Sequence, residues 1–191
     1  MAAAQMRRES SPTRPIPAIE ALSAESARAL EPALAALLKD SVDGGASVGF
    51  LPPLDLEEAG RYWQGVLAAI ERDSRLLWVA RDPDGAITGT IQLDLETRPN
   101  GTHRAEVMKL MVHSASRRRG IGRALMQAAE EEARRRGRTT LVLDTRHGDP
   151  SEALYRSLGW ERAGVIPRYA RSADGALDPS AFYYRLLDPG G

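Results

Sequence analysis

Three side chains stand out as candidates for acid–base chemistry. Glu106 and Asp144 are carboxylates in segments that are otherwise apolar, and Tyr155 lies on a short amphipathic segment. A carboxylate in an apolar strand is costly to bury without a partner, so each one faces solvent, an ion-pair partner or a reactive site. Positioned carboxylates and phenols can accept and donate protons during group transfer. The structural alternatives are an ion pair of Glu106 with Lys109 or Arg104, and a loop cap formed by Asp144.

A second candidate site is a basic, glycine-containing stretch between a predicted strand and a predicted helix. It comprises Arg117, Arg118, Arg119, Gly120, Ile121, Gly122 and Arg123. The first turn of a helix has unpaired backbone N–H groups and the positive end of the helix dipole, which suit a pyrophosphate. Glycines let phosphate oxygens approach the backbone closely. The stretch matches neither a dinucleotide-binding fingerprint nor a P-loop. The alternative is a solvated basic helix start that binds nothing.

The composition argues against several classes of function. Lys+Arg and Asp+Glu both number 26, and this zero net charge argues against a nucleic-acid partner, which usually requires a basic excess. The absence of cysteine excludes disulfides, a thiolate nucleophile and a zinc–thiolate site, and we expect no metal site. No apolar run approaches the ~20 residues that span a bilayer, and the first residues lack a secretory signal. We therefore expect a cytoplasmic protein with no membrane partner.

The elements that position these residues follow from changes in hydrophobic period. Residues 1–13 are expected to be a flexible leader, residues 14–188 a single mixed α/β domain, and residues 189–191 a tail. Helices are predicted at 23–42, 55–72 and 120–136 and within 149–160, and strands at 14–20, 75–82, 87–96, 104–112, 139–145, 160–172 and 181–187. Pro32 would kink the first helix or mark a restart. Ser23, Asp55 and Asp149 would cap the first, second and last helices, and Gly137 would end the helix 120–136.

Two expectations concern which faces of the strands are buried. Strand 139–145 is apolar and lies between helices in sequence, so it is expected to be buried on both faces. In strand 104–112, regular alternation would place Glu106, Met108, Leu110 and Val112 on one face.

Two separated motifs resemble those of the GCN5-related N-acetyltransferase (GNAT) family. The R-x-x-G-x-G pattern at Arg117–Gly122 is similar to that family's acetyl-CoA signature. The later string "SEALYRSLGWERAG" resembles the family's short helix, with Tyr155, Gly159 and Trp160 at its marked positions. The resemblance covers about residues 14–188. It implies an α/β (α+β) GNAT fold, with a mixed, mostly antiparallel central sheet of about seven strands flanked by about four helices.

The resemblance implies acetyl-CoA as co-substrate. The backbone of Leu110, Met111 and Val112 would pair with the pantetheine arm as an added strand does. The backbone amides of residues 118–123 would hold the pyrophosphate, and Arg117 would open the motif. Many family members have an asparagine seven residues before the tyrosine. Gly148 stands there instead, so that contact is lost or made by backbone.

The resemblance also implies catalytic roles. The Val112 N–H would polarise the thioester carbonyl, and Tyr155 would protonate the departing thiolate. Within the family, the chain looks most like the tabtoxin-resistance acetyltransferases, which have carboxylates at the positions of Glu106 and Asp144. That pair would take the acceptor's proton, through water, and orient its ammonium.

The acceptor side is expected to involve the loop 44–50, which would cover the pocket in this fold. Ser47 offers a hydroxyl, Phe50 an apolar wall, and Trp78 is a further candidate with core packing as its alternative. His103, His113 and His147 are expected at the surface. The expected function is acetyl transfer to a small amino-acid-like amine, such as a toxin or antibiotic, in a direct ternary complex. A protein or peptide acetyltransferase and a non-catalytic acyl-CoA-binding module stay as alternatives, and a homodimer is left open.

Overall fold

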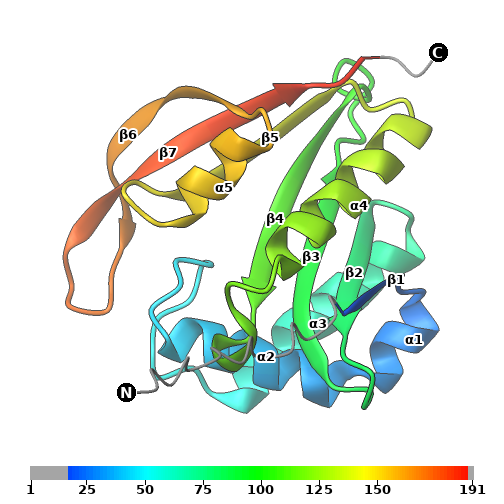
Figure 1. Cartoon of the computed structure of the whole chain (residues 1–191), viewed down its shortest axis with the longest axis vertical. Coiled ribbons are helices and arrows are strands. Elements are labelled where there is room, and N and C mark those ends of the chain that lie inside the picture. Colours follow the sequence, from blue (N-terminus) through cyan, green and yellow to red (C-terminus); the bar gives the residue numbers. More distant parts are fainter. Residues whose placement is uncertain (1–16, 189–191) are drawn as a thin grey trace, which may run out of the picture.

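The structure, a computed structural model, describes residues 17–188, so the predicted leader (1–13) and tail (189–191) lie outside it. Within this range the chain forms seven strands, five α-helices and one short 3-10 turn (Figure 1). The helices are α1 (Ala24–Ala29), α2 (Glu31–Asp43), α3 (Leu56–Glu71), α4 (Ile121–Arg135) and α5 (Ser151–Ser157), and the 3-10 turn is η1 (Ser114–Ser116). The strands are β1 (Ala18–Ala21), β2 (Arg75–Arg81), β3 (Ile87–Leu95), β4 (Arg104–Val112), β5 (Thr140–Arg146), β6 (Glu161–Arg171) and β7 (Leu177–Leu186).

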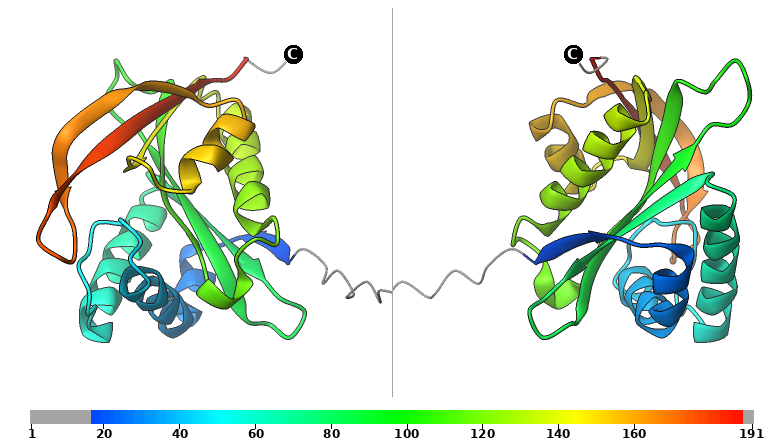
Figure 2. Two further views of the ribbon diagram at one scale, coloured as in Figure 1. Left: turned by 60° about the vertical axis from the view of Figure 1, so that its left-hand side comes forward. Right: turned by 90° about the vertical axis from the view of Figure 1, so that its right-hand side faces the viewer.

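All the strands join one sheet in the order β1-β2-β3-β4-β5-β7-β6. Only the β4–β5 pair is parallel. Helices α4 and α5 cover one face of the sheet, and α1, α2 and α3 cover the other (Figures 1 and 2). The predicted fold class, a mixed and mostly antiparallel sheet flanked by helices, is confirmed.

Each helical layer packs its apolar side chains on the sheet as a separate core. Ile121, Leu125 and Ala129 of α4 fall at helical spacing and are buried against Ile91 and Leu93 of β3. The core on the opposite face is built from these buried side chains of the first three helices and the sheet: Ala27, Leu34, Leu38, Val42, Ala59, Trp63, Val66, Leu77, Val79 and Met111. Strand β3 therefore lies between two helical layers and is buried along nearly its whole length.

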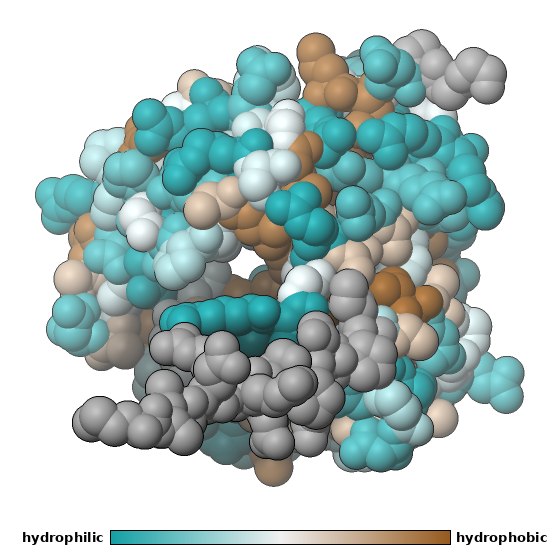
Figure 3. All heavy atoms as spheres, viewed as in Figure 1, coloured by the Kyte–Doolittle hydropathy of each residue, from teal (hydrophilic) through white to brown (hydrophobic). Residues whose placement is uncertain are grey.

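Strands β4 and β5 separate soon after they begin. They are in register only at Arg104↔Thr140, Ala105↔Leu141 and Glu106↔Val142. Within residues 17–188, no strand pairs with that side of β4 beyond Glu106, while β5 continues beside β7. The sheet consequently splits into a β1–β4 part and a β5–β7 part. The space-filling view has an opening near its centre, where the two parts diverge (Figure 3).

A β-bulge in β4 re-aims its side chains. Gln92 pairs with Met108 but Thr90 pairs with Met111, so Lys109 and the residue after it oppose a single residue of β3. Lys109 has the left-handed φ of 50°. Leu110 and Val112 consequently pack against the core under α4, as Ala105 and Val107 do, on the face opposite Glu106. The prediction that Glu106, Met108, Leu110 and Val112 share one face was wrong, because regular alternation stops at the bulge.

The predicted helix 23–42 is two helices. Ser23 caps α1 by accepting the Ser26 N–H, as predicted, and the chain breaks at Leu30. Pro32 lies in the first turn of α2, where its missing N–H costs no helical hydrogen bond. Of the two alternatives for Pro32, the structure shows the restart.

Two further expectations at the β5–α5 corner were wrong. Leu141 and Leu143 are buried but Asp144 is exposed, so β5 is covered on one face only. The cause is the split of the sheet, because the first three helices cover only the β1–β4 part. Helix α5 begins after Pro150 with no side-chain cap, and Asp149 contributes its backbone carbonyl to Glu152 instead.

None of the helices within residues 17–188 combines the length and apolar composition that a bilayer crossing requires.

Candidate active site

A cleft of about 680 Å³ lies at the open end of the split, where the end of β4 faces the start of α5. All of the predicted cofactor residues except Arg119 line it, namely Leu110, Met111, Val112, Arg117, Arg118, Gly120, Ile121, Gly122 and Arg123. The opposite wall is formed by Asp149, Pro150, Ser151 and Leu154 from the start of α5. The structure thus brings the basic, glycine-containing stretch and the later predicted motif to two sides of one cleft.

The loop before α4 presents backbone N–H groups to this cleft. Arg118 and Gly120 have left-handed φ values of 61° and 79°, with Arg119 between them. Alternation of this kind turns successive N–H groups toward a common point and forms an anion-binding nest. Gly120 is also the N-cap of α4, and no side chain caps that helix. The free amides of the first turn and the helix dipole add to the attraction for an anion.

Most of the arginine side chains of this loop are held by protein groups. Arg119 extends away from the cleft and forms an ion pair with Asp82 at 3.3 Å. Arg117 donates to the Val112 carbonyl at 3.3 Å, and Arg123 donates to the Ser157 hydroxyl at 2.7 Å. Any attraction of this loop for an anion would therefore come mainly from backbone amides, to which exposed Arg118 and Arg117 add positive potential.

Gly122 has a packing role in addition to its place at the cleft. A Cβ at this position would lie 3.3 Å from the Leu154 side chain. The missing side chain lets α4 approach α5 closely, which sets the width of the cleft between them.

Tyr155 is buried behind the α5 wall. Its ring packs on those of Trp160 and Tyr183, with centroids 6.3 and 5.9 Å away. Its hydroxyl bonds to the side chain of Ser151, which lines the cleft. Burial raises the pKa of the Tyr155 phenol, so the group stays protonated at neutral pH. Tyr155 can therefore serve as a proton donor but not as a base.

Glu106 and Asp144 lie on the same face of the sheet at the base of the split. Glu106 is in register with Val142, two residues before Asp144 on β5. Burial, and next the negative charge of Asp144, raise the pKa of the Glu106 carboxyl. Asp144 is exposed and accepts the Ser180 hydroxyl at 3.1 Å. Within residues 17–188, Glu106 makes no ion pair with Lys109 or Arg104, so neither of these cations holds its carboxylate.

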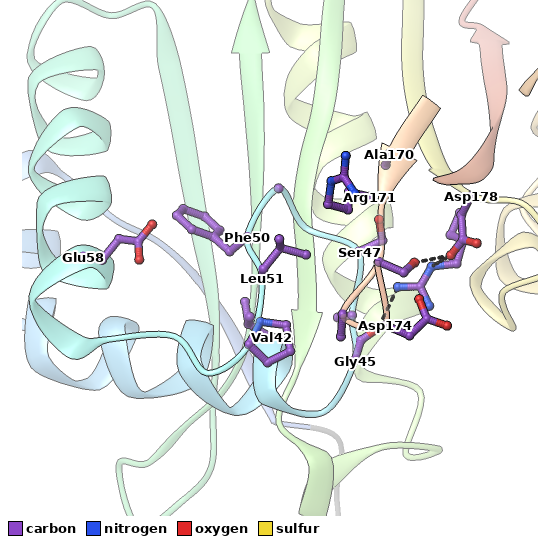
Figure 4. Close-up of a pocket in the computed structure, with 16 residues that line it drawn as sticks. Val42, Gly45, Ser47, Phe50, Leu51, Glu58, Ala170, Arg171, Asp174 and Asp178 are labelled. Atoms are coloured by element: carbon purple, nitrogen blue, oxygen red, sulfur yellow. Dashed lines mark hydrogen bonds and ion pairs between the residues drawn. The ribbon is translucent and has the colours of Figure 1, made fainter. Parts of the chain in front are cut away.

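A second pocket, of about 790 Å³, adjoins the cleft. It lies between the loop that joins α2 to α3 and the β6–β7 hairpin, and Gly45 and Ala46 line both cavities. Ser47 lines it from the loop, and Phe50 points toward the α3 side (Figure 4). The predicted Trp78 does not line it. Trp78 is only 6% exposed and belongs to the core under α4, because its side chain is on the face of β2 opposite Leu77 and Val79, which pack under the first three helices.

Sequence reasoning missed Arg146, which lines this pocket together with Arg171, and Lys109, which does not line the pocket but lies beside Phe50. Arg146 donates to the Gly45 carbonyl at 2.8 Å and pairs with Asp178 at 3.4 Å, which connects the loop to the hairpin (Figure 4). Lys109 Nζ lies 6.0 Å from the Phe50 ring centroid and 5.5 Å from that of Tyr62. A signal for Lys109 was present, because regular alternation would have placed this lysine in the core.

The three histidines are at least partly exposed, as predicted. His147 bonds to Glu152 at 3.1 Å, and His113 accepts the Ala115 N–H at 3.2 Å. His103 is exposed beside the turn that precedes β4. None of them lines the cleft or the pocket.

Comparisons with known proteins agree with this geometry. The chain is 39% identical over 109 residues to an uncharacterised N-acetyltransferase from Azospirillum brasilense, a match that covers 56% of this chain and 62% of that protein. The crystal structure of a ribosomal-protein-alanine N-acetyltransferase from Brucella melitensis superposes with a TM-score of 0.73 at 26% identity, covering 89% of this chain and 99% of that one.

A phosphinothricin acetyltransferase from Sinorhizobium meliloti, solved in complex with acetyl-CoA, has the same fold. Its TM-score is 0.71 at 23% identity, and the match covers 92% of this chain and 90% of that one. The model of the acetyltransferase (GNAT) family matches residues 45–160, a span that includes most residues of the cleft and part of the neighbouring pocket. The chain belongs to the acetyltransferase (GNAT) family.

Proposed function

We propose that this protein is an N-acetyltransferase that binds acetyl-CoA in the cleft between β4 and β5 and transfers the acetyl group directly to an amine in the adjoining pocket. The main support for the proposal is that Gly45 and Ala46 line both cavities, which therefore adjoin there. One cavity has an uncapped helix start for an anion, and the other is open to a second molecule. Their junction lets two substrates meet without a covalent enzyme intermediate.

The residues of the cleft suit acetyl-CoA. The amides at the start of α4 would hold the pyrophosphate. The side of β4 that lacks a strand partner would bond to the amides of the pantetheine arm, as in strand addition. The acetyl-CoA complex of the Sinorhizobium meliloti protein supports this assignment, because that protein shares the fold.

The Val112 N–H is the proposed donor to the thioester carbonyl. His113 N–H bonds to the Thr88 carbonyl on β3, whereas the Val112 carbonyl accepts from Arg117. Neighbouring residues of a strand point their backbone groups to opposite sides, so those of Val112 face the split. A donor there would stabilise the negative charge that develops on the carbonyl oxygen.

In the proposed transfer, the acetyl carbon exchanges its bond to sulfur for a bond to the acceptor nitrogen. The ionised Glu106–Asp144 pair takes a proton from the acceptor ammonium through water. The amine nitrogen then forms a bond to the carbonyl carbon, and the bond from that carbon to sulfur breaks. Tyr155, with Ser151 between it and the cleft, donates its proton to the departing thiolate. The nitrogen loses its second proton as the amide forms, and that proton replaces the one that Tyr155 gave up. The products are the N-acetylated amine and free coenzyme A.

A small amino-acid-like amine is the proposed acceptor, and a toxin or antibiotic of the kind handled by tabtoxin-resistance or phosphinothricin acetyltransferases is a candidate. The pocket supports a small acceptor because the bond from Arg146 to the Gly45 carbonyl closes the loop against the hairpin. The relative from Brucella melitensis acts on a ribosomal-protein alanine, so an N-terminal peptide is the second candidate. A cytoplasmic location and a homodimer are retained as predictions.

The test is a thiol-release assay with acetyl-CoA against amino acids, aminoglycosides, polyamines and peptides. The proposal predicts release of free thiol with at least one amine and formation of its N-acetyl product. Binding of acetyl-CoA without release for any of these amines would instead indicate the non-catalytic module.

A further inference from the structure

Lys109 occupies an unusual backbone position for its type. It has a φ of 50° within the bulge of β4. Residues other than glycine pay roughly 1–2 kcal/mol in this left-handed conformation, because Cβ approaches the following carbonyl oxygen. In a regular strand the same residue would point into the core under α4. The bulge turns it to the opposite face, which it shares with Glu106, so the strained backbone delivers this particular side chain to the acceptor side.

The surroundings of the Lys109 ammonium combine aromatic rings with charges of both signs. Its Nζ lies over Phe50 and Tyr62, and it lies 3.4 Å from the place where a Cβ on Gly49 would be. Gly49 and Phe50 line the acceptor pocket. Burial, and next the positive charge of Arg75, lower the pKa of the Lys109 amine. The aromatic faces stabilise the cation only in part.

The Lys109 ammonium also lacks a counter-ion at bonding distance. Among residues 17–188, no carboxylate oxygen lies within 4.0 Å of Nζ. Two carboxylates of this region are engaged by other groups, whereas Glu106 makes no ion pair within residues 17–188. Asp94 accepts two hydrogen bonds from Arg75, at 2.7 and 2.9 Å, and Asp144 accepts the hydroxyl of Ser180. Glu106 and Asp144 attract Lys109 only through space. A largely buried cation without a bonded partner favours an anionic ligand.

We propose that Lys109 binds the carboxylate of the acceptor and so makes the enzyme select amino acids over simple amines. An α-amino acid carries its carboxylate one carbon away from its amine. With the carboxylate on Lys109, the amine faces Glu106 and Asp144, which are the groups that receive its proton. Polyamines and lysine side chains lack that carboxylate and so leave the positive charge of Lys109 without a bonded partner. This inference rests on the proposed function, because it requires an acetyl-accepting amine in this pocket.

The experiment compares matched acceptors in wild type and in three variants. L-methionine and L-phosphinothricin are each paired with the α-carboxamide and with the decarboxylated amine. The carboxamide lowers the amine pKa and decarboxylation raises it, so an effect common to both analogues cannot come from amine basicity. The readout is the ratio of kcat/KM for the acid to kcat/KM for each analogue. The variants are Lys109→Met, Lys109→Arg and Lys109→Gly.

Wild type is expected to favour each acid by about tenfold or more over both analogues, in line with a charged hydrogen bond. Lys109→Met should bring these ratios near one, through KM for the acid, and Lys109→Arg should retain the preference. Lys109→Gly relieves the strained φ and should lose the preference without losing thermal stability. Equal loss for acids and analogues in Lys109→Met would overturn the inference, and so would an unchanged ratio.

A binding measurement separates this inference from the proposed function. The same acids and analogues are titrated into the complex of the protein with free coenzyme A, where no acetyl transfer occurs. The inference predicts tighter binding of the acids to wild type and equal binding of acids and analogues to Lys109→Met. If wild type releases no thiol but shows this pattern, the proposed function fails and the carboxylate site stands. If the wild-type complex binds acids no more tightly than the analogues, the inference is wrong whatever the turnover.

Discussion

Replacing Glu106 with Gln tests the base, because it removes the ionisable group and keeps the size of the side chain. Positioned general bases contribute about 10²–10⁴-fold to rate, which corresponds to about 3–5 kcal/mol of transition-state stabilisation. We therefore expect kcat to fall by a factor in that range, while the affinity for acetyl-CoA in the cleft beside Leu110 stays near that of wild type.

The same substitution should not destabilise the fold at neutral pH. Burial and Asp144 raise the folded-state pKa of Glu106. For a carboxyl with a raised pKa, the stabilising contribution is present at low pH and is lost as the pH rises through the folded-state value. The ionised group is thus unfavourable at pH 7, and a neutral Gln should keep or raise the melting temperature. Lost activity with retained stability distinguishes a base from a structural carboxylate.

The pH profile supplies the decisive control. A base works only when ionised, so kcat/KM of wild type should fall as the pH drops through the pKa of Glu106, which lies above its ordinary 4.5. In Asp144→Asn a negative neighbour is gone, the pKa of Glu106 falls, and the acid limb should move to lower pH. The assignment is refuted if Glu106→Gln keeps wild-type kcat, or if Asp144→Asn moves the limb upward.

Two further substitutions test the cleft. Tyr155→Phe should slow turnover by about 10²-fold with acetyl-CoA affinity retained, as measured by thiol release and by titration; equal turnover would remove Tyr155 from its role as acid. Gly120→Val should weaken acetyl-CoA binding far more than Arg119→Ala, because a β-branched residue cannot easily adopt φ 79°, whereas the Arg119 side chain pairs with Asp82 outside the cleft. Calorimetric titration measures both, and a larger loss in Arg119→Ala would show that side-chain charge, and not the backbone, holds the pyrophosphate.

The sequence predicted the elements well where local signals were strong. Ser23 and Asp55 cap helices as expected, accepting N–H groups at 3.1 Å in each case. Gly120 begins α4, and Gly137 follows its end with the left-handed φ of 69°. Each of these positions depends on the chemistry of a few neighbouring residues, which a single sequence displays directly.

The predictions that failed concern features set by contacts between segments that lie far apart in the sequence. The split between β4 and β5 exposes Asp144 and leaves β5 covered on one side. The charge of Asp144 in an otherwise apolar strand signals an uncovered position, but it does not reveal that the two strands separate. The bulge at Lys109 depends on register with β3. The Arg146 contact with Gly45 joins residues far apart in the chain, so the wall of the acceptor pocket could not be read from either segment.

The central claim is tested most directly by initial-rate kinetics of the wild-type chain with acetyl-CoA and the best amine found in the thiol-release assay. The account predicts intersecting double-reciprocal lines, one N-acetyl product for each thiol released, and loss of both in Glu106→Gln. Parallel lines, or tight acetyl-CoA binding with no thiol released by any amine or peptide, would contradict direct transfer across the junction of the two cavities.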